Sequence, residues 1–365
     1  MGRPWFVNAA ATILGLTALA GARLWIETPA AREAPAHLWS LIAPQPKAKA
    51  KDLGIPYDRY ETKDTLGRDI TYYLSPAPAG APDPGTPLAL FIQGSGASSV
   101  FMKAPDGRLG GGLQNLLLRD ANNRFRVMVV EKPGVEFLDA PEHPGSAINA
   151  PPVFRREHTY ERWREALRAA LDAALATPGI DASRVLVVGH SEGADMAAAL
   201  AAVEPRVTHA ACLAGGGPTQ LFDLAQLARA PQTPDEPEAE REDRVEEVYR
   251  AWERIAADPD NPDALEWGHP HARWSSFMRH SAIDALSRSN ARVYLAYGTN
   301  DRAVPVESND ALRAELVVRG RDVTVERRVG EDHGFATPGG PQGAAGGFGP
   351  VFGHVIDWWL EPAKG

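Results

Sequence analysis

The residues with the clearest potential for chemistry begin with a serine in a glycine-flanked turn. Ser191 is the centre of the Gly-His-Ser-Glu-Gly pentad at 189–193, which follows the apolar run 185–188 and precedes an alanine-rich stretch. The pattern predicts a buried strand, a very tight turn and a helix, with the hydroxyl at the apex beside the helix N-terminus. A serine hydroxyl is a weak nucleophile until a neighbouring base takes its proton. The rest of the chain must therefore supply a base and an acid.

Asp301 and His333 are the candidates for that acid and that base. Asp301 follows the next-to-last apolar run, and His333 follows the last one in an Asp-His-Gly loop. Sites in open α/β sheets form at the carboxyl ends of the strands, and the order serine, aspartate, histidine is one of the known triad orders. Glu331 and Asp332 are nearer to His333 in sequence, but a sequence neighbour usually points elsewhere. The alternatives are an ordinary turn serine at 191, a turn-capping aspartate and a plain loop histidine.

Strands and helices alternate along most of the chain. Such alternation predicts parallel strands joined by helical crossovers, hence an α/β fold with a mostly parallel central sheet and helices on both faces. A Pro/Gly/Ala connector at 76–87 is not expected to be crossed by a strand. The expected strands are 70–74, 88–92, 126–130, 185–188, 207–213, 293–297 and 323–329, and the expected helices are 113–118, 160–175, 192–202, 312–318 and 348–359.

The alternation breaks between residues 221 and 290. This stretch is acidic, helical in character and punctuated by prolines, and its long acidic run is most simply a solvated helix face. We expect a helical cap insertion there, over one end of the sheet. The catalytic domain would then consist of 52–220 and 291–365.

The N-terminal stretch has the pattern of a targeting segment. Arg3 precedes an apolar stretch at 6–22, and the Ala-Leu-Ala at 18–20 resembles a small-residue cleavage site. We interpret 1–25 as a signal peptide or a membrane anchor and 26–51 as a linker. The protein would be exported to the periplasm or the exterior, or attached to the membrane by this segment.

Composition excludes several classes of function. The 365 residues carry a net charge of −9 without a basic cluster, which argues against binding of nucleic acid. Cys212 is the only cysteine, so no internal disulfide can form, and we expect a buried thiol. His269, His271 and His280 lack the carboxylate or cysteine spacing that would complete a ligand set. No metal and no cofactor are expected.

The chain resembles the α/β-hydrolase fold over about residues 50–220 and 290–365. The 189–193 pentad is similar to its nucleophile elbow, and the loops that carry Asp301 and His333 look most like those of the dienelactone-hydrolase and prolyl-oligopeptidase-like branches. The resemblance implies that Ser191 attacks an acyl carbonyl, that His333 acts as general base and then acid, and that Asp301 fixes the imidazole tautomer.

The same resemblance implies an oxyanion hole made of two backbone N–H groups. One belongs to Glu192, directly after the nucleophile. The other is assigned to Ser95, in the loop after the 88–92 strand, with Gly94 and Gly96 allowing close backbone approach. Many relatives carry His-Gly in this loop, whereas this chain has Gln93 before Gly94.

Three aromatic residues of the expected cap are candidates for substrate contact. They are Trp267, Trp274 and Phe277, next to the expected cleft. Aromatic residues in such a region more often form the core of the cap, and this is the alternative. His190 lies inside the pentad, and we expect its side chain to point away from the hydroxyl as a packing or site-wall residue.

The sequence therefore predicts a serine hydrolase that cleaves an ester or similar acyl bond of a small molecule through an acyl-enzyme. A peptidase or a thioesterase on the same triad is the alternative, although we assign no fixed charge in the cap that would hold a peptide terminus. A catalytically inert binding protein of the same fold is a further alternative. The oligomeric state is left open.

Overall fold

An eight-stranded sheet forms the centre of the molecule. The computed structural model describes residues 43–78, 85–337 and 344–361. The strand order is β1-β2-β6-β3-β7-β8-β11-β12; β1 and β2 run antiparallel to their neighbours and the other strands are parallel. The predicted mostly parallel sheet is confirmed. The strands are β1 (Asp58–Lys63), β2 (Asp69–Leu74), β3 (Thr86–Ile92), β6 (Arg126–Val130), β7 (Ile180–His190), β8 (Val207–Leu213), β11 (Arg292–Gly298) and β12 (Val323–Arg328).

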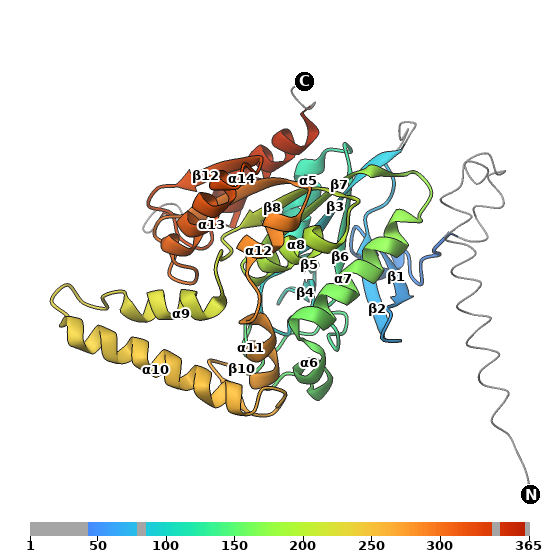
Figure 1. The fold of residues 1–365 in the computed structure, drawn as a ribbon. Helices are drawn as coiled ribbons and strands as arrows, with labels where there is room; N and C mark the ends of the chain where they lie inside the picture. The colour runs from blue at the N-terminus through green and yellow to red at the C-terminus, as the bar shows by residue number, and fades with distance from the viewer. Residues whose placement is uncertain (1–42, 79–84, 338–343, 362–365) are drawn as a thin grey trace, which may run out of the picture.

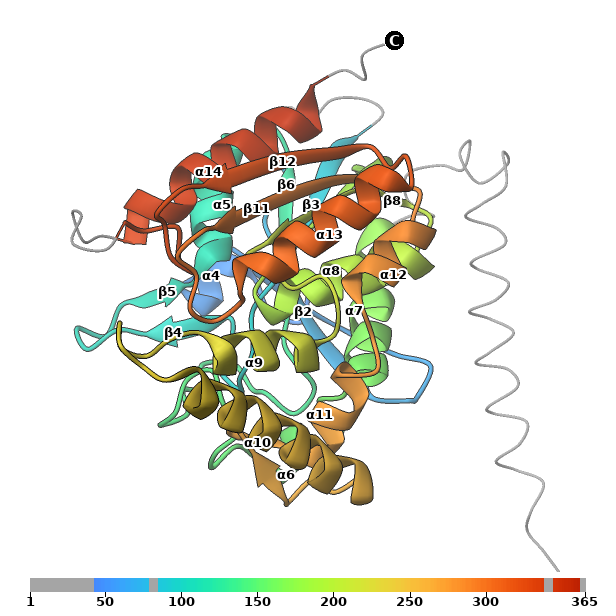
Figure 2. The ribbon, with the colours of Figure 1, turned by 60° about the vertical axis from the view of Figure 1, so that its left-hand side comes forward.

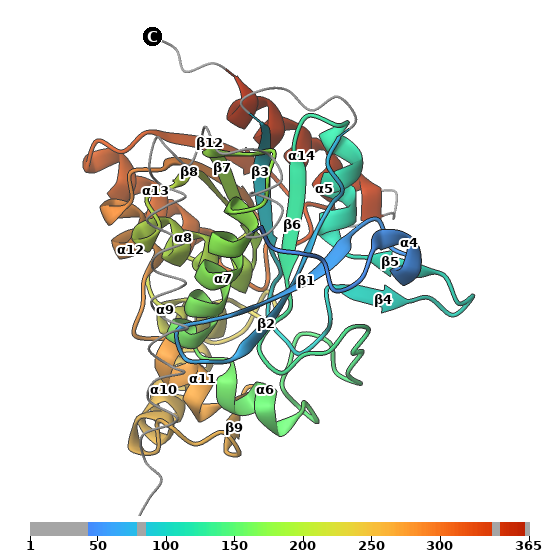
Figure 3. The ribbon, with the colours of Figure 1, turned by 90° about the vertical axis from the view of Figure 1, so that its right-hand side faces the viewer.

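Helices cover both faces of this sheet, which explains why β3 and β6 are buried along their whole length. Figures 1 and 3 show α5 and α14 on one face and α7, α8, α12 and α13 on the other. Each group packs into its own apolar cluster against the sheet. The helices are α5 (Leu113–Ala121), α7 (Tyr160–Leu175), α8 (Glu192–Val203), α12 (Ala282–Arg288), α13 (Val306–Val318) and α14 (Ala344–Leu360).

Most of the chain between β8 and β11 forms an additional layer at one end of the sheet, as Figure 2 shows. Its first part, the α9–α11 segment, contains α9 (Gln220–Arg229), α10 (Glu238–Ala257), β9 (Leu265–Glu266), β10 (His269–Pro270) and α11 (His271–Phe277). Helix α10 packs on α9 and α11, whereas α12 packs on α8 and α13 with its buried side chains in the cluster of the main sheet. The division of the chain into a catalytic domain and a cap stays a prediction.

Several elements have no counterpart in the expectations from sequence. These are the edge strand β1, the ribbon β4 (Phe101–Lys103) and β5 (Leu109–Gly111), and the helices α4 (Ala50–Leu53) and α6 (Pro152–Glu157). Strand β3 also begins at Thr86, so the expectation that no strand crosses 76–87 is wrong for its last two residues. The pairing of β3 with β7 shifts register between Thr86 and Leu88, and Pro87 lies at this irregularity, where its missing N–H does no harm.

The N-terminal predictions fall largely outside the described residues. The proposed signal peptide or anchor at 1–25 and most of the linker at 26–51 are not described. The end of that linker is ordered, because the backbone N–H groups of Lys47 and Ala48 donate to the Arg59 carbonyl of β1. Within the described ranges, the helices include none with the length and apolar character needed to span a membrane.

Candidate functional site

Ser191 lies at a strained turn between β7 and α8. Its backbone has φ 57° and ψ −128°, a conformation that costs a non-glycine residue roughly 1–3 kcal/mol and is concentrated at functional sites. The flanking glycines make the turn possible. A Cβ at Gly189 would overlap the Gly193 carbonyl, and a Cβ at Gly193 would overlap the Ile92 carbonyl of β3. The pentad therefore forms the strand–turn–helix that its sequence predicts.

Asp301 and His333 are hydrogen-bonded to each other, with 2.8 Å between Asp301 Oδ2 and His333 Nδ1. The Asp301 side chain is fully buried, and its other oxygen accepts the backbone N–H groups of Ala303 and Val304. The aspartate thus caps the following turn and also orients the imidazole. Because a carboxylate only accepts, Nδ1 of His333 carries the proton and Nε2 is the basic nitrogen.

The two carboxylates nearer to His333 in sequence are engaged elsewhere. Glu331 Oε2 accepts from Arg328 Nε at 2.6 Å, and Asp332 Oδ1 accepts the N–H groups of Gly334 and Ala336. Asp332 therefore closes its own loop. Of the three candidates, Asp301 is the one that contacts the imidazole.

His190 supports the loop that carries His333. Its Nε2 lies 2.9 Å from the His333 carbonyl oxygen, and its ring packs against the His333 ring and the edge of Phe348. Burial, with a smaller contribution from the nearby His333, lowers the pKa of His190 to about 4. The uncharged ring donates Nε2–H to the carbonyl, which gives His190 a packing role at the wall of the site.

The glycine loop after β3 lies directly beside the nucleophile. A Cβ on Gly94 would stand 3.3 Å from Ser191 Cβ and 3.8 Å from its Oγ. Ser95 and Glu192 line the same pocket as Ser191. Glu192 is the first residue of α8, so its N–H has no carbonyl partner within the helix. The structure brings together the residues expected to form the oxyanion hole.

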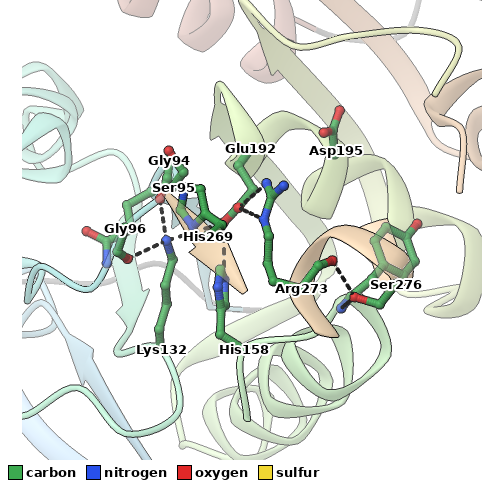
Figure 4. A network of polar contacts seen from close by, with 12 residues as sticks. Gly94, Ser95, Gly96, Lys132, His158, Glu192, Asp195, His269, Arg273 and Ser276 are labelled. Carbon is green, nitrogen blue, oxygen red and sulfur yellow. Dashed lines mark hydrogen bonds and ion pairs between the residues drawn. The ribbon is translucent and has the colours of Figure 1, made fainter. Parts of the chain in front are cut away.

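A buried network of charges connects this loop to α8 and to the α9–α11 segment, as Figure 4 shows. The Glu192 carboxylate accepts from Arg273 Nη2 at 2.7 Å and lies 3.3 Å from Lys132 Nζ and 3.2 Å from His158 Nε2. Lys132 Nζ also donates to the carbonyl of Gly94 and, at 3.0 Å, to that of Gly96. One ammonium group therefore joins the glycine loop to the residue after the nucleophile.

The charge states of this network follow from burial and from the neighbouring groups. Burial alone would raise the pKa of Glu192, but Lys132, His158 and Arg273 outweigh it and hold that pKa well below its usual range. Burial lowers the pKa of Lys132, and Glu192 opposes this effect. Burial also lowers the pKa of His158 to about 4. Glu192 is thus ionised and His158 uncharged at neutral pH.

A pocket of about 190 Å³ opens beside Ser191. One part of its wall is apolar and the other is polar. The apolar part consists of Leu224, Leu227, Trp274, Ala303 and Val304, and the polar part includes Asp195, Gln220, Asp223, His269 and Arg273.

Of the three aromatics expected to contact substrate, Trp274 lines this pocket. Trp267 is 38% exposed and packs edge-on against Trp274. Phe277 is only 2% exposed and packs in the main apolar cluster, edge-on against Tyr160. It therefore belongs to the core against the main sheet, and not to a separate core of the expected cap.

The remaining histidines and the cysteine have structural partners. His269 Nε2 lies 3.1 Å from the Gly145 carbonyl, and His280 stacks on Tyr160. Within the described residues there is no group of three or more His, Cys, Asp or Glu side chains that could hold a metal ion. Cys212 is buried in the apolar cluster, as predicted.

Several charged residues of the site were missed in the sequence, chiefly Lys132, His158, Asp195, Asp223 and Arg273. Two local signals existed. Lys132 follows the buried strand β6 almost directly, and Asp195 lies one helical turn after Ser191. The other three belong to no motif, because only the fold brings them to the pocket.

Comparisons with solved structures identify the fold of the chain. A puromycin-hydrolysing peptidase of Mycobacterium tuberculosis matches with a TM-score of 0.53 and 18% identity, and an acylaminoacyl peptidase of Pyrococcus horikoshii with 0.57 and 12%; both alignments cover 85% of this chain. A 2,6-dihydroxy-pseudo-oxynicotine hydrolase matches with 0.52 and 19%, covering 85% of this chain and 69% of the hydrolase. The chain has the α/β-hydrolase fold. It spans 41% and 43% of the lengths of the two peptidases.

This fold assignment rests on structure. No protein-family model and no curated protein sequence matches the chain. At 12–19% identity the structural matches establish the fold alone, and the chemistry of this chain must be argued from its own site.

Proposed function

We propose that this α/β-hydrolase-fold protein is a serine hydrolase that cleaves an ester or similar acyl bond of a small molecule. The observation that carries the proposal is the buried Asp301–His333 hydrogen bond, in loops at the same sheet edge as the strained Ser191 turn. This arrangement supplies a nucleophile, a base and a group that orients the base. It also disfavours an inert binding protein, in which such strain would serve no purpose.

The proposed reaction proceeds in two acyl transfers. His333 Nε2 takes the proton of Ser191 as Oγ attacks the acyl carbonyl, and the N–H groups of Glu192 and Ser95 stabilise the oxyanion. The imidazolium, stabilised by Asp301, then protonates the leaving group as the carbon–heteroatom bond breaks. Water, activated by the same imidazole, releases the acid and regenerates the serine.

The identity of the leaving group is a second question. An alcohol would make the protein an esterase, a thiol a thioesterase and an amine a peptidase or amidase. The names of two similar structures support the peptidase as the second candidate. In this chain, the pocket offers Arg273 as a buried charge, but Glu192 and Gln220 already occupy its guanidinium.

Hydrolysis of a substrate panel tests the proposal. We expect turnover of short p-nitrophenyl esters by the purified protein and none above background by Ser191→Ala. Thioesters and aminoacyl p-nitroanilides with matched acyl groups separate the three subclasses. Equal turnover by the variant would refute the assignment of the nucleophile.

We also propose that residues 1–25 direct the protein to export or to the membrane, and that residues 221–290 act as a cap. The apolar N-terminal run supports the first, and the position of the α9–α11 segment beside the pocket supports the second. N-terminal sequencing of the protein from membrane and soluble fractions distinguishes a cleaved leader from an anchor.

A further inference from the structure

Two carboxylates lie in the wall of the Ser191 pocket without a role in the reaction above. Asp195 is on α8, four residues after Ser191 and thus about 6 Å further along the helix axis. Asp223 is on α9 and lines the same pocket. Two different elements therefore contribute acidic groups to the pocket that Ser191 also lines.

The two carboxylates differ in their hydrogen bonding. Asp195 Oδ2 accepts from Gln220 Nε2 at 2.8 Å. Asp223 is only 7% exposed, and its Oδ1 has no hydrogen-bond partner among the described residues. A buried carboxylate oxygen without a donor is costly, so the protein leaves the carboxylate of Asp223, a residue of the pocket wall, incompletely satisfied.

Among the described residues that line the pocket, no cationic side chain is free to pair with Asp195 and Asp223. Arg273 is the one lysine or arginine among the described lining residues, and its guanidinium is bound to Glu192 and to Gln220 Oε1. His269 also lines the pocket, but burial lowers its pKa to about 3, so it is uncharged at neutral pH. Gln220 in turn donates to Asp195. Arg273 thus holds Gln220 in place and does not pair with either aspartate. A positively charged group of a ligand could therefore pair with Asp195 and Asp223.

The remainder of the wall indicates what accompanies that charge. Leu224, Leu227 and Val304 line the pocket together with Trp274. Apolar side chains of this size bury an aliphatic or aromatic group favourably. The pocket therefore combines an acidic end with an apolar surface, both next to the nucleophile.

We propose that this pocket binds the free ammonium group of an aminoacyl substrate at Asp195 and Asp223, with the apolar side chain of that acyl group against Leu224 and Leu227. The preferred substrates are then aminoacyl esters or amides with an unblocked amine. The inference rests on the proposed serine hydrolase and names its substrate class. It also identifies the fixed charges that sequence reasoning could not assign for an exopeptidase.

The titration of the two groups agrees with this role. Burial raises the pKa of Asp195 to about 7; Gln220 and Arg273 oppose the rise, and Asp223 and Glu192 add to it. Burial likewise raises the pKa of Asp223 to about 7, opposed by Ser308 and assisted by Asp301. A bound ammonium ion stabilises the ionised forms, so recognition of the amine weakens as the pH falls below about 7.

A pair of substrates that differ by one amine tests the proposal. Leucine p-nitroanilide and 4-methylpentanoic acid p-nitroanilide are identical apart from the ammonium group. At pH 7.5 we expect kcat/KM to favour the amine by about 10- to 100-fold, the range for hydrogen bonds to a charged group. Asp195→Asn and Asp223→Asn should each reduce this ratio toward one, whereas Asp235→Asn, an exposed control on the loop before α10, should leave it unchanged. A wild-type ratio of one or less, or an unchanged ratio in both pocket variants, overturns the proposal.

A binding measurement separates failure of this proposal from failure of the proposed function. In Ser191→Ala, calorimetry with leucinamide and 4-methylpentanamide needs no catalysis. We expect the amine to bind at least about tenfold more tightly, and the added Asp195→Asn substitution to remove the difference. Selective binding without turnover in the wild type would retain the ammonium site and reject the hydrolase. Turnover of the des-amino substrate with no selectivity for the amine would retain the hydrolase and reject the ammonium site.

Discussion

Replacement of Lys132 by methionine tests whether the buried charge network holds the oxyanion loop. The ammonium group donates to the carbonyls of Gly94 and Gly96, on either side of Ser95. The Gly94 carbonyl and the Ser95 N–H belong to one planar trans peptide and point in opposite directions. Lys132 therefore fixes the direction of the Ser95 N–H by holding the carbonyl behind it.

The magnitude follows from the contacts that are lost. Lys132→Met has a similar volume and removes an entirely buried charge, while Glu192 keeps its pair with Arg273. Loss of one partner from a buried ionic network costs about 3 kcal/mol of unfolding free energy. Removal of an oxyanion donor costs about 100- to 1,000-fold in kcat. Because the donor is loosened rather than deleted, we expect kcat to fall about 10- to 100-fold with KM within about threefold.

The assay is the steady-state hydrolysis of a p-nitrophenyl ester, run under conditions in which urea unfolding shows the variant to be folded. Lys103→Met, at an exposed position at the end of β4, is the control for the loss of a lysine. A folded Lys132→Met variant with kcat within twofold of the wild type would refute the reasoning. A parallel loss of kcat and rise in KM would indicate general disorder of the pocket instead.

Three further predictions concern the partner of the base His333, the residue His190 that contacts the His333 loop, and Asp223 in the pocket wall. Asp301→Asn should lower kcat about 10⁴-fold, because the amide favours the wrong imidazole tautomer, while Glu331→Gln should stay within about twofold; the reverse result in steady-state assays would reassign the acid. His190→Asn should lower kcat about tenfold through loss of its contact with the His333 loop. The pH dependence of kcat/KM between pH 5 and 8 should persist, because His190, with a pKa lowered to about 4, is uncharged there. Asp223→Asn should raise the unfolding free energy at pH 8 by about 1–2 kcal/mol and by little at pH 4. Burial raises the folded-state pKa of this carboxyl to about 7, above its unfolded value, so ionisation destabilises the native state as pH rises. Urea unfolding at the two pH values measures the difference, and a destabilised variant at pH 8 would contradict it.

The parts of the fold that were predictable have strong local patterns. Strand β8 coincides with the predicted 207–213 run, and α7 with the predicted 160–175 helix. Continuous apolar runs identify strands that are covered on both faces. Strand β1 was missed because Asp58–Lys63 is mostly charged or polar, as expected of an edge strand with one buried residue.

The residues of the site also fall into those that the sequence predicted and those that it did not. The Ser191 turn can be recognised in the sequence because close approach of the backbone requires its two glycines. Asp301 and His333 could be paired because both follow strands of one sheet. Lys132 and Arg273 approach Glu192 from elements far apart in sequence, and no spacing of residues encodes such a contact. Substrate recognition was least predictable for the same reason, since helices of separate segments form the pocket wall.

Covalent labelling with a fluorophosphonate tests the central claim most directly. The reagent phosphonylates a serine only when a base activates the hydroxyl and the oxyanion site stabilises the adduct. Mass spectrometry of the labelled protein should find a single adduct on the peptide that carries Ser191, and Ser191→Ala should remain unlabelled. Equal labelling of both proteins, or an unlabelled wild type, would contradict the account.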